Sequence, residues 1–242
     1  MIENTSHHQQ NVGLFRMLAL ATFCCVVLIA GRLWLKWHSL PQVSSWQEFV
    51  DARGMTYIFL IWNLFLAWIP YLAASRFEHL QTRQSGQISM LFMFCVWLAF
   101  LPNAPYLITD FLHFRYKPPI PLWYDLVLLF AFASTGLLLG LLSLHKMHQA
   151  LRGRFSNIFS NFTILASIGL SGFGIWLGRF QRWNSWDIIT RPEALLLDIA
   201  NTLTTWHELV RAVGVSVLLS GILLIGYGLL LAIMGNRVTS RS

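Results

Sequence analysis

The sequence predicts an all-α, polytopic transmembrane helix bundle, and three observations support this fold class. Of the 242 residues, 56% are hydrophobic and only 11% are charged, a balance outside the usual range of soluble domains. Six stretches nearly free of charge reach the roughly 20 residues that a helix needs to cross the bilayer core. The rest of the chain is divided into connections, the longest running from Arg179 to Arg211, so no room is left for a separate soluble domain.

The predicted spans form one transmembrane domain at 14–236, between a polar N-terminal tail at 1–13 and a C-terminal tail at 237–242. No small-x-small cleavage site follows the first span, so we expect it to be retained rather than removed as a signal peptide. The six spans are expected at about 14–35, 55–74, 88–107, 122–144, 159–178 and 212–234.

The first three spans differ in their polar residues. The first has Arg16 and Arg32 near its ends, where long side chains can extend to the lipid headgroups. The second is uncharged. The third is apolar until Pro102 and Pro105, which each remove a backbone donor and predict a break in the helix. Carbonyl groups freed at membrane depth are tolerated only where protein or a wet cavity surrounds them.

The last three spans are almost free of charge. The fourth contains a single acid, Asp125, near its start, and the fifth and sixth contain no charge at all. Pairs of glycines four residues apart let helix backbones approach each other closely. Such pairs occur at Gly136 and Gly140 in the fourth span and at Gly174 and Gly178 in the fifth, so we expect these two spans to be buried.

Two connections on the same side of the bundle carry helix-start patterns. Thr190-Arg-Pro-Glu193 has capping-box spacing with proline in the first turn, and Ser45-Trp-Gln-Glu48 repeats the pattern in the first loop. Apolar residues follow the later motif. We therefore predict two short helices that lie in the membrane interface and cover one face of the bundle.

The orientation rests on a weak charge signal, because lysines and arginines are nearly evenly divided between the two sides. The compact basic group Lys146, Arg152 and Arg154 in the fourth loop favours both termini in the cytoplasm. Most acids then lie on the non-cytoplasmic side. They are Glu48, Asp51, Asp110, Asp125, Asp187, Glu193, Asp198 and Glu208.

The broken third span contains the first candidate site residues. Asn103 and Tyr106 lie at the break, and Asp110 and His113 follow it. If the chain is helical again after the break, Asp110 and His113 share a face because they are three residues apart. The alternative is a kinked helix end at which Asp110 simply faces water.

Asp125, in the first turn of the fourth span, is the second candidate. A carboxylate there is favoured by the helix dipole and by free N–H groups, which gives it a purely structural interpretation. The functional alternative is that Asp125 pairs with a basic residue from another loop, since an ionisable group near the apolar core is costly unless it is matched.

The segment after the fifth span contains the remaining candidates, Arg179, Arg182, Asn184 and Asp187. Guanidinium groups bind carboxylates and phosphates bidentately. The two arginines are therefore expected to clamp Asp110 and Asp125, to bind an anionic ligand, or to extend to the headgroups. The sequence leaves these three alternatives open.

Other chemistries have little support. Asp110, His113, Asp125, Asp187 and His207 could supply metal ligands, but their spacing matches no metal motif, so no metal is predicted. No glycine-rich phosphate loop or nucleophile elbow occurs, and we predict no cofactor. The net charge of +7 is scattered over loops and termini, which favours lipid headgroups over nucleic acid as the partner.

Three motifs together, Leu101-Pro-Asn-Ala-Pro-Tyr-x-x-Thr-Asp110, Trp123-Tyr-Asp-Leu126 and Gly178-Arg-Phe-x-Arg-Trp-Asn-Ser-Trp-Asp187, resemble the DUF1361 family of multi-pass bacterial membrane proteins of unknown function. The similarity extends from about Tyr57 to Met234. This resemblance implies a bacterial cytoplasmic (inner) membrane location and offers no activity, so the sequence leaves open whether the protein is an enzyme.

Three functional hypotheses follow from these residues. The favoured one is a binding or transport protein with a site for a small anionic or lipid ligand on the non-cytoplasmic face. A membrane enzyme acting on a lipid-linked or phosphate-bearing substrate is the second, with a carboxylate as general base. A structural or assembly subunit, in which the charges are only buried ion pairs, is the third. The protein partners are not determined by the sequence.

Overall fold

The computed structural model describes residues 2–39, 57–83, 86–116 and 119–239, and side chains from residue 12 to residue 234 within these ranges. The described chain is helical and contains no strand. Six helical segments in it are long and apolar enough to cross a membrane, at 12–39, 59–82, 87–113, 122–152, 157–180 and 206–234. The predicted fold class is confirmed, and the number of candidate spans in the described chain agrees with the six that were predicted.

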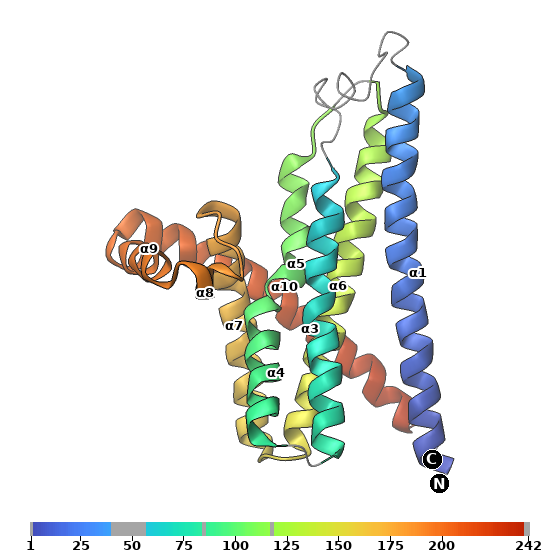
Figure 1. The fold of residues 1–242 in the computed structure, drawn as a ribbon, viewed down its shortest axis with the longest axis vertical. Helices are drawn as coiled ribbons and strands as arrows, with labels where there is room; N and C mark the ends of the chain where they lie inside the picture. The colour runs from blue at the N-terminus through green and yellow to red at the C-terminus, as the bar shows by residue number, and fades with distance from the viewer. Residues whose placement is uncertain (1, 40–56, 84–85, 117–118, 240–242) are drawn as a thin grey trace.

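The elements, in chain order, are α1 (Ile2–Ser39), α3 (Phe59–Thr82), α4 (Gln87–Phe100), α5 (Asn103–Tyr106), the 3₁₀ helix η2 (Leu107–His113), α6 (Leu122–Arg152), α7 (Asn157–Phe180), α8 (Asp187–Thr190), α9 (Pro192–Thr204) and α10 (Trp206–Thr239). The most extensive contacts join α3 to α6, α7 to α10 and α3 to α4. In Figure 1, α1 stands at one side of the bundle, α10 crosses it obliquely, and α9 projects sideways beside the upper end of α7.

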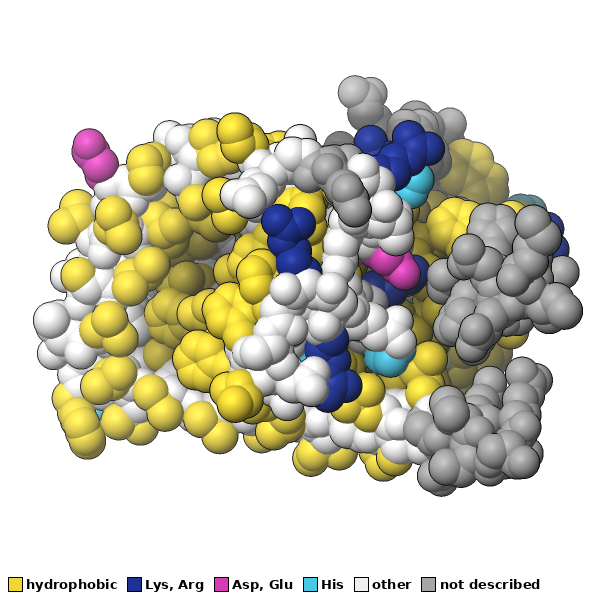
Figure 2. Space-filling view, turned by 90° about the horizontal axis from the view of Figure 1, so that it is seen from below, with side chains coloured by type: hydrophobic (Ala, Val, Ile, Leu, Met, Phe, Trp, Pro, Cys, Tyr) yellow, Lys and Arg dark blue, Asp and Glu magenta, His cyan; other side chains and the backbone are white. Residues whose placement is uncertain are grey.

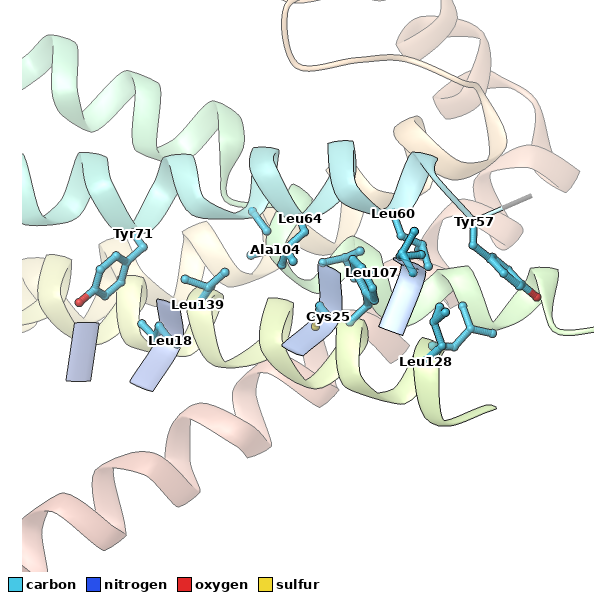
Figure 3. Close-up of a cluster of buried hydrophobic side chains, with 14 of the residues drawn as sticks. Leu18, Cys25, Tyr57, Leu60, Leu64, Tyr71, Ala104, Leu107, Leu128 and Leu139 are labelled. Atoms are coloured by element: carbon cyan, nitrogen blue, oxygen red, sulfur yellow. The ribbon is translucent and has the colours of Figure 1, made fainter. Parts of the chain in front are cut away.

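The core lies along α3 and α6, which explains why so much of α6 is buried. Figure 3 shows Leu60 and Leu64 of α3 facing Ala104 and Leu107 of the broken third crossing, with Leu128 of α6 nearby. Further along the bundle, buried Trp97 of α4 donates an indole hydrogen bond to the hydroxyl of Ser143 of α6 at 3.1 Å. A buried indole N–H with a partner costs far less than one without.

The third crossing is broken where the two prolines predict it. Helix α4 ends at Phe100, and Asn103 begins a separate turn that continues as η2. The break is buried in protein, because glycines of the flanking spans make room for it. A Cβ at Gly136 would lie 2.5 Å from the carbonyl oxygen of Ala104, and one at Gly174 would lie 2.6 Å from Pro102 Cγ. The glycine pairs therefore pack against the broken segment of the third crossing rather than against another straight helix.

Several boundaries differ from the sequence-based expectation. Helix α1 already begins at Ile2, so the predicted polar tail is helical. Helix α6 continues to Arg152, and Lys146 lies in this helix, where it pairs with Glu78 of α3 at 3.1 Å, rather than in a loop. The span ends were predicted from the ends of the apolar runs. A helix continues beyond such a run as long as its backbone hydrogen bonds and its packing allow.

The predicted helix after Pro192 is present as α9, but its capping box is not formed. The residue before α9 is Arg191, and the Thr190 hydroxyl donates instead to Trp186 O and to Asp187 Oδ1. The position of α9 in a membrane interface remains a prediction. The second expected interfacial helix, around Ser45–Glu48, lies outside the described residues.

Candidate functional site

A buried ion pair joins α1 to α6. Arg32 Nε donates to Asp125 Oδ1 at 2.7 Å and Arg32 Nη2 donates to Asp125 Oδ2 at 3.1 Å, which is bidentate geometry. Both side chains are at most 3% exposed. The Arg32 guanidinium also lies 4.6 Å from the ring centroid of Tyr57. The expectation that Arg32 extends to the headgroups is therefore wrong, because an acid of similar depth on the neighbouring helix satisfies it inside the protein.

A second ion pair holds the end of the broken crossing against α7. Arg179 Nη2 donates to Asp110 Oδ1, and Arg179 Nε donates to the Thr109 hydroxyl at 2.8 Å. The amide of Asn63 donates to the other carboxylate oxygen of Asp110 at 3.3 Å. His113 Nδ1 lies 3.9 Å from Asp110, so the two residues do share a face. Asp110 is fully buried, which contradicts the alternative in which it faces water.

Asp187 organises the turn that leads from α7 to α9. It accepts hydrogen bonds from the Asn184 backbone N–H at 2.8 Å and from Arg191 Nη2 at 3.1 Å, and its side chain is buried. These bonds, with the Asn184 backbone N–H contributing most, hold the pKa of the Asp187 carboxyl below its ordinary value. Asp187 is thus committed to its own loop.

The three acids therefore do not converge on one site. Arg179 binds Asp110 but not Asp125, whose partner is Arg32. Arg182 has a positive φ of 62°, is exposed, and makes no ion pair within the described part of the chain. Of the clamp that was one alternative for the two arginines, only the pair between Arg179 and Asp110 is present. Asp125 lies where α1 rather than α7 approaches α6, so Arg32 is its partner.

A groove of about 520 Å³ lies next to the second ion pair. Its walls come from α3, α4, α5 and α7, and the α8–α9 segment closes one end of it. Cavities of this volume bind ligands with several tens of atoms or part of a lipid. Among the sequence-predicted residues, it brings together Asn103, Tyr106 and Asn184.

The groove is polar at one end and apolar at the other. Asn63, Asn103, Tyr106, Asn184 and Ser185 line the end beside the helix break. The other end is lined by apolar positions such as Cys95 of α4 and Leu170 of α7. Leu170 lies eight residues before Gly178 on α7, which corresponds to about 12 Å. This gradient matches an amphipathic molecule with one polar end.

The ring of Tyr106 packs against Arg179 and Gly178. Arg179 lies 4.6 Å from the centroid of the Tyr106 ring, and a Cβ at Gly178 would lie 3.2 Å from the same ring. Within the described residues, the Tyr106 hydroxyl has no hydrogen-bond partner, and the ring lines the groove. By contrast, the Asn103 amide donates to Ser185 at 2.8 Å and to the carbonyl oxygen of Phe100 at 3.1 Å.

Sequence reasoning missed Arg32, Asn63, Thr109 and Ser185 as partners of the candidate residues. Arg32 and Asn63 had a usable signal, since a guanidinium or amide within an apolar span needs a partner at the same depth. No comparable signal in the sequence pointed to Thr109 or Ser185. As for metals, the described residues contain no group of three or more His, Cys, Asp or Glu side chains close enough to hold an ion.

The fold and these buried charges together define a polytopic helical membrane protein whose helices are joined by ion pairs and whose side carries an amphipathic groove. The chain belongs to the family described as "Protein of unknown function (DUF1361)", which it matches over residues 62–225. That region includes both halves of the Asp110–Arg179 pair and all of the residues that line the groove, whereas Arg32 precedes it. No curated protein and no solved structure matched the chain.

Proposed function

We propose that this protein is a membrane binding protein that holds a lipid-like, amphipathic ligand in the groove between α3, α4, α5 and α7. The observation that carries the proposal is Tyr106, whose ring packs against Arg179 and lines the groove beside its polar residues, and whose hydroxyl has no hydrogen-bond partner in the described chain. A hydroxyl in such a place is suited to a hydrogen bond with an uncharged polar head, such as a glycerol or amide group.

The ion pairs support an uncharged rather than an anionic head. Arg179 is already bound to Asp110 and Thr109, so an anion would have to compete with a buried carboxylate for it. The polar residues that do line the groove are neutral. We therefore assign Asp110, Asp125, Arg179 and Asp187 to the framework and propose Asn103, Tyr106 and Asn184 as ligand contacts.

The apolar end of the groove supports a hydrocarbon tail. Exposed edge residues such as Trp62 and Leu170 border the groove, so a chain could enter from the side of the bundle. The enzymatic alternative calls for a carboxylate facing the substrate, and no Asp or Glu lines this groove in the described chain. Release of the bound molecule on the other side of the membrane would make the same site part of a transporter.

The proposal is tested by native mass spectrometry of the detergent-purified protein with monoolein, a neutral lipid with a glycerol head. Tyr106→Phe removes one hydrogen bond and should weaken monoolein retention by about 2- to 10-fold. Ala99→Trp fills the groove and should abolish retention. Tyr116→Phe, at an exposed tyrosine away from the groove, is the matched control and should bind as the parent does.

Equal retention by the parent, Tyr106→Phe and Ala99→Trp would contradict the proposal. The melting temperature of each variant should be recorded in the absence of lipid, because a variant that binds less only after losing its fold would not support the site. Tyr106→Phe keeps the ring against Arg179, so its fold should be preserved.

A further inference from the structure

A second groove lies at the opposite end of the bundle from the first. It has a volume of about 540 Å³ and lies between the start of α4, the end of α6 and the start of α7. Phe77, Met90 and Leu151 are buried in its floor, and exposed Ile88 and Phe159 border it. Its lining is apolar apart from Gln87, Arg154 and Thr163.

Arg154 extends across the head of this groove. It belongs to the short connection between α6 and α7, and its Nη1 lies 3.3 Å from Met90 Sδ of α4. A thioether is a weak acceptor, so most of the donor capacity of the guanidinium is unused. Lys146, in the same basic group, is paired with Glu78, whereas Arg154 makes no ion pair within the described chain. The groove thus has a cation at its head that lacks a carboxylate.

The position of Arg154 relative to the spans indicates what kind of anion it would meet. It lies between the last residue of one membrane-length helix and Ser156, the capping residue of the next. This is the depth at which lipid headgroups lie, and the positive end of the α7 helix dipole favours an anion near the same place. Seen from this end of the molecule, dark-blue basic side chains lie between broad apolar areas (Figure 2).

We propose that this groove binds one anionic phospholipid, with the phosphate at Arg154 and an acyl chain along α4. The wall from Gln87 to Phe94 is about 10 Å long, which accommodates the first half of an acyl chain. A chain in the groove covers the apolar floor, while the guanidinium fork binds the phosphate bidentately. Charge complementarity selects an anionic phospholipid over a zwitterionic one. This site does not depend on the groove proposed for the uncharged ligand.

The headgroup half of the inference is tested by thermal unfolding of the purified protein with added phosphatidylglycerol, phosphatidylcholine or inorganic phosphate. Phosphatidylglycerol should raise the melting temperature by several degrees more than phosphatidylcholine, and inorganic phosphate alone should have no effect. Arg154→Gln should abolish the preference, and Arg154→Lys should retain part of it. Arg152→Gln, which removes an exposed arginine outside the groove, is the matched control and should keep the full preference.

The acyl-chain half is tested on α7. Thr163→Trp places an indole in the groove and should reduce the phosphatidylglycerol effect, whereas Leu165→Trp, on the exposed side of the same helix, should leave it unchanged. A full preference in Arg154→Gln, or full stabilisation by inorganic phosphate, would overturn the site. A full effect in Thr163→Trp would overturn the placement of the acyl chain.

Discussion

Arg32 and Asp125 carry charges that would be costly to bury alone, and each is stabilised by the other. Both are almost fully buried, and together they fasten α1 to α6. Removing one partner of such a pair leaves an uncompensated buried charge, at a cost of about 3 to 5 kcal/mol. We expect Arg32→Gln to lower the melting temperature and the folded yield sharply, as measured by thermal unfolding and size-exclusion chromatography in detergent.

The appropriate comparison is Arg211→Gln, which breaks the pair between Arg211 and Glu208. Those side chains are 71% and 37% exposed, so the loss should be about 1 kcal/mol or less. The double variant Arg32→Gln with Asp125→Asn should be more stable than Arg32→Gln alone, because no charge is left without a partner. Equal stability of Arg32→Gln and Arg211→Gln would refute the role assigned to the buried pair.

The carboxylate of Asp187 predicts a pH dependence. Its hydrogen bonds lower its pKa in the folded state, so the ionised form stabilises the fold above the unfolded pKa of about 4. This contribution is lost as the pH falls through the folded pKa. Compared with Asp187→Asn, the parent should be more stable at pH 7, and the difference in melting temperature should shrink below about pH 4. Glu193→Gln, at an exposed acid of α9, should show no such trend.

At the scale of the element, the broken third crossing depends on the absence of side chains on its neighbours. A Cβ at Gly136 would lie 2.5 Å from Ala104 O and 2.5 Å from Leu107 Cδ1. We expect Gly136→Ala to destabilise the fold by about 1 to 3 kcal/mol through overpacking, although alanine is the better helix former. Gly169→Ala, with no atom within 4 Å of the added Cβ, should be neutral or slightly stabilising. The melting temperatures of Gly136→Ala and Gly169→Ala, measured by thermal unfolding, test this expectation. Equal melting temperatures would contradict the close packing at Gly136.

The presence and approximate positions of the membrane-length helices were predictable from the sequence, whereas the exact ends of these helices were not. The two prolines correctly indicated the break after Phe100, because proline removes a backbone donor whatever surrounds it. The end of α6 was placed too early, since Lys146 was treated as the end of an apolar run. Its pairing with Glu78 of α3 made the charge compatible with a helix interior, and no local signal reveals such a partner.

At the scale of the whole molecule, α1 begins and α10 ends at the same end of the bundle (Figure 1), as six crossings require. We propose that this end faces the cytoplasm of a bacterial inner membrane. Alkaline phosphatase, which is active only outside the cytoplasm, should then be inactive when fused after Ser242. The same reporter fused after Arg182, in the connection at the other end, should be active. The reverse pattern would invert the topology.

The sequence by itself determined that this is a helical membrane protein, how many of its segments are long and apolar enough to cross the bilayer, and where one of them breaks. These properties follow from composition, run length and the chemistry of single residues, which act locally. Only the tertiary structure decided that Asp125 pairs with Arg32 and Asp110 with Arg179, and that Asn103, Tyr106 and Asn184 share a groove. Which side chains meet depends on how helices distant in the sequence are rotated and tilted against each other, and this is fixed by packing over the whole bundle.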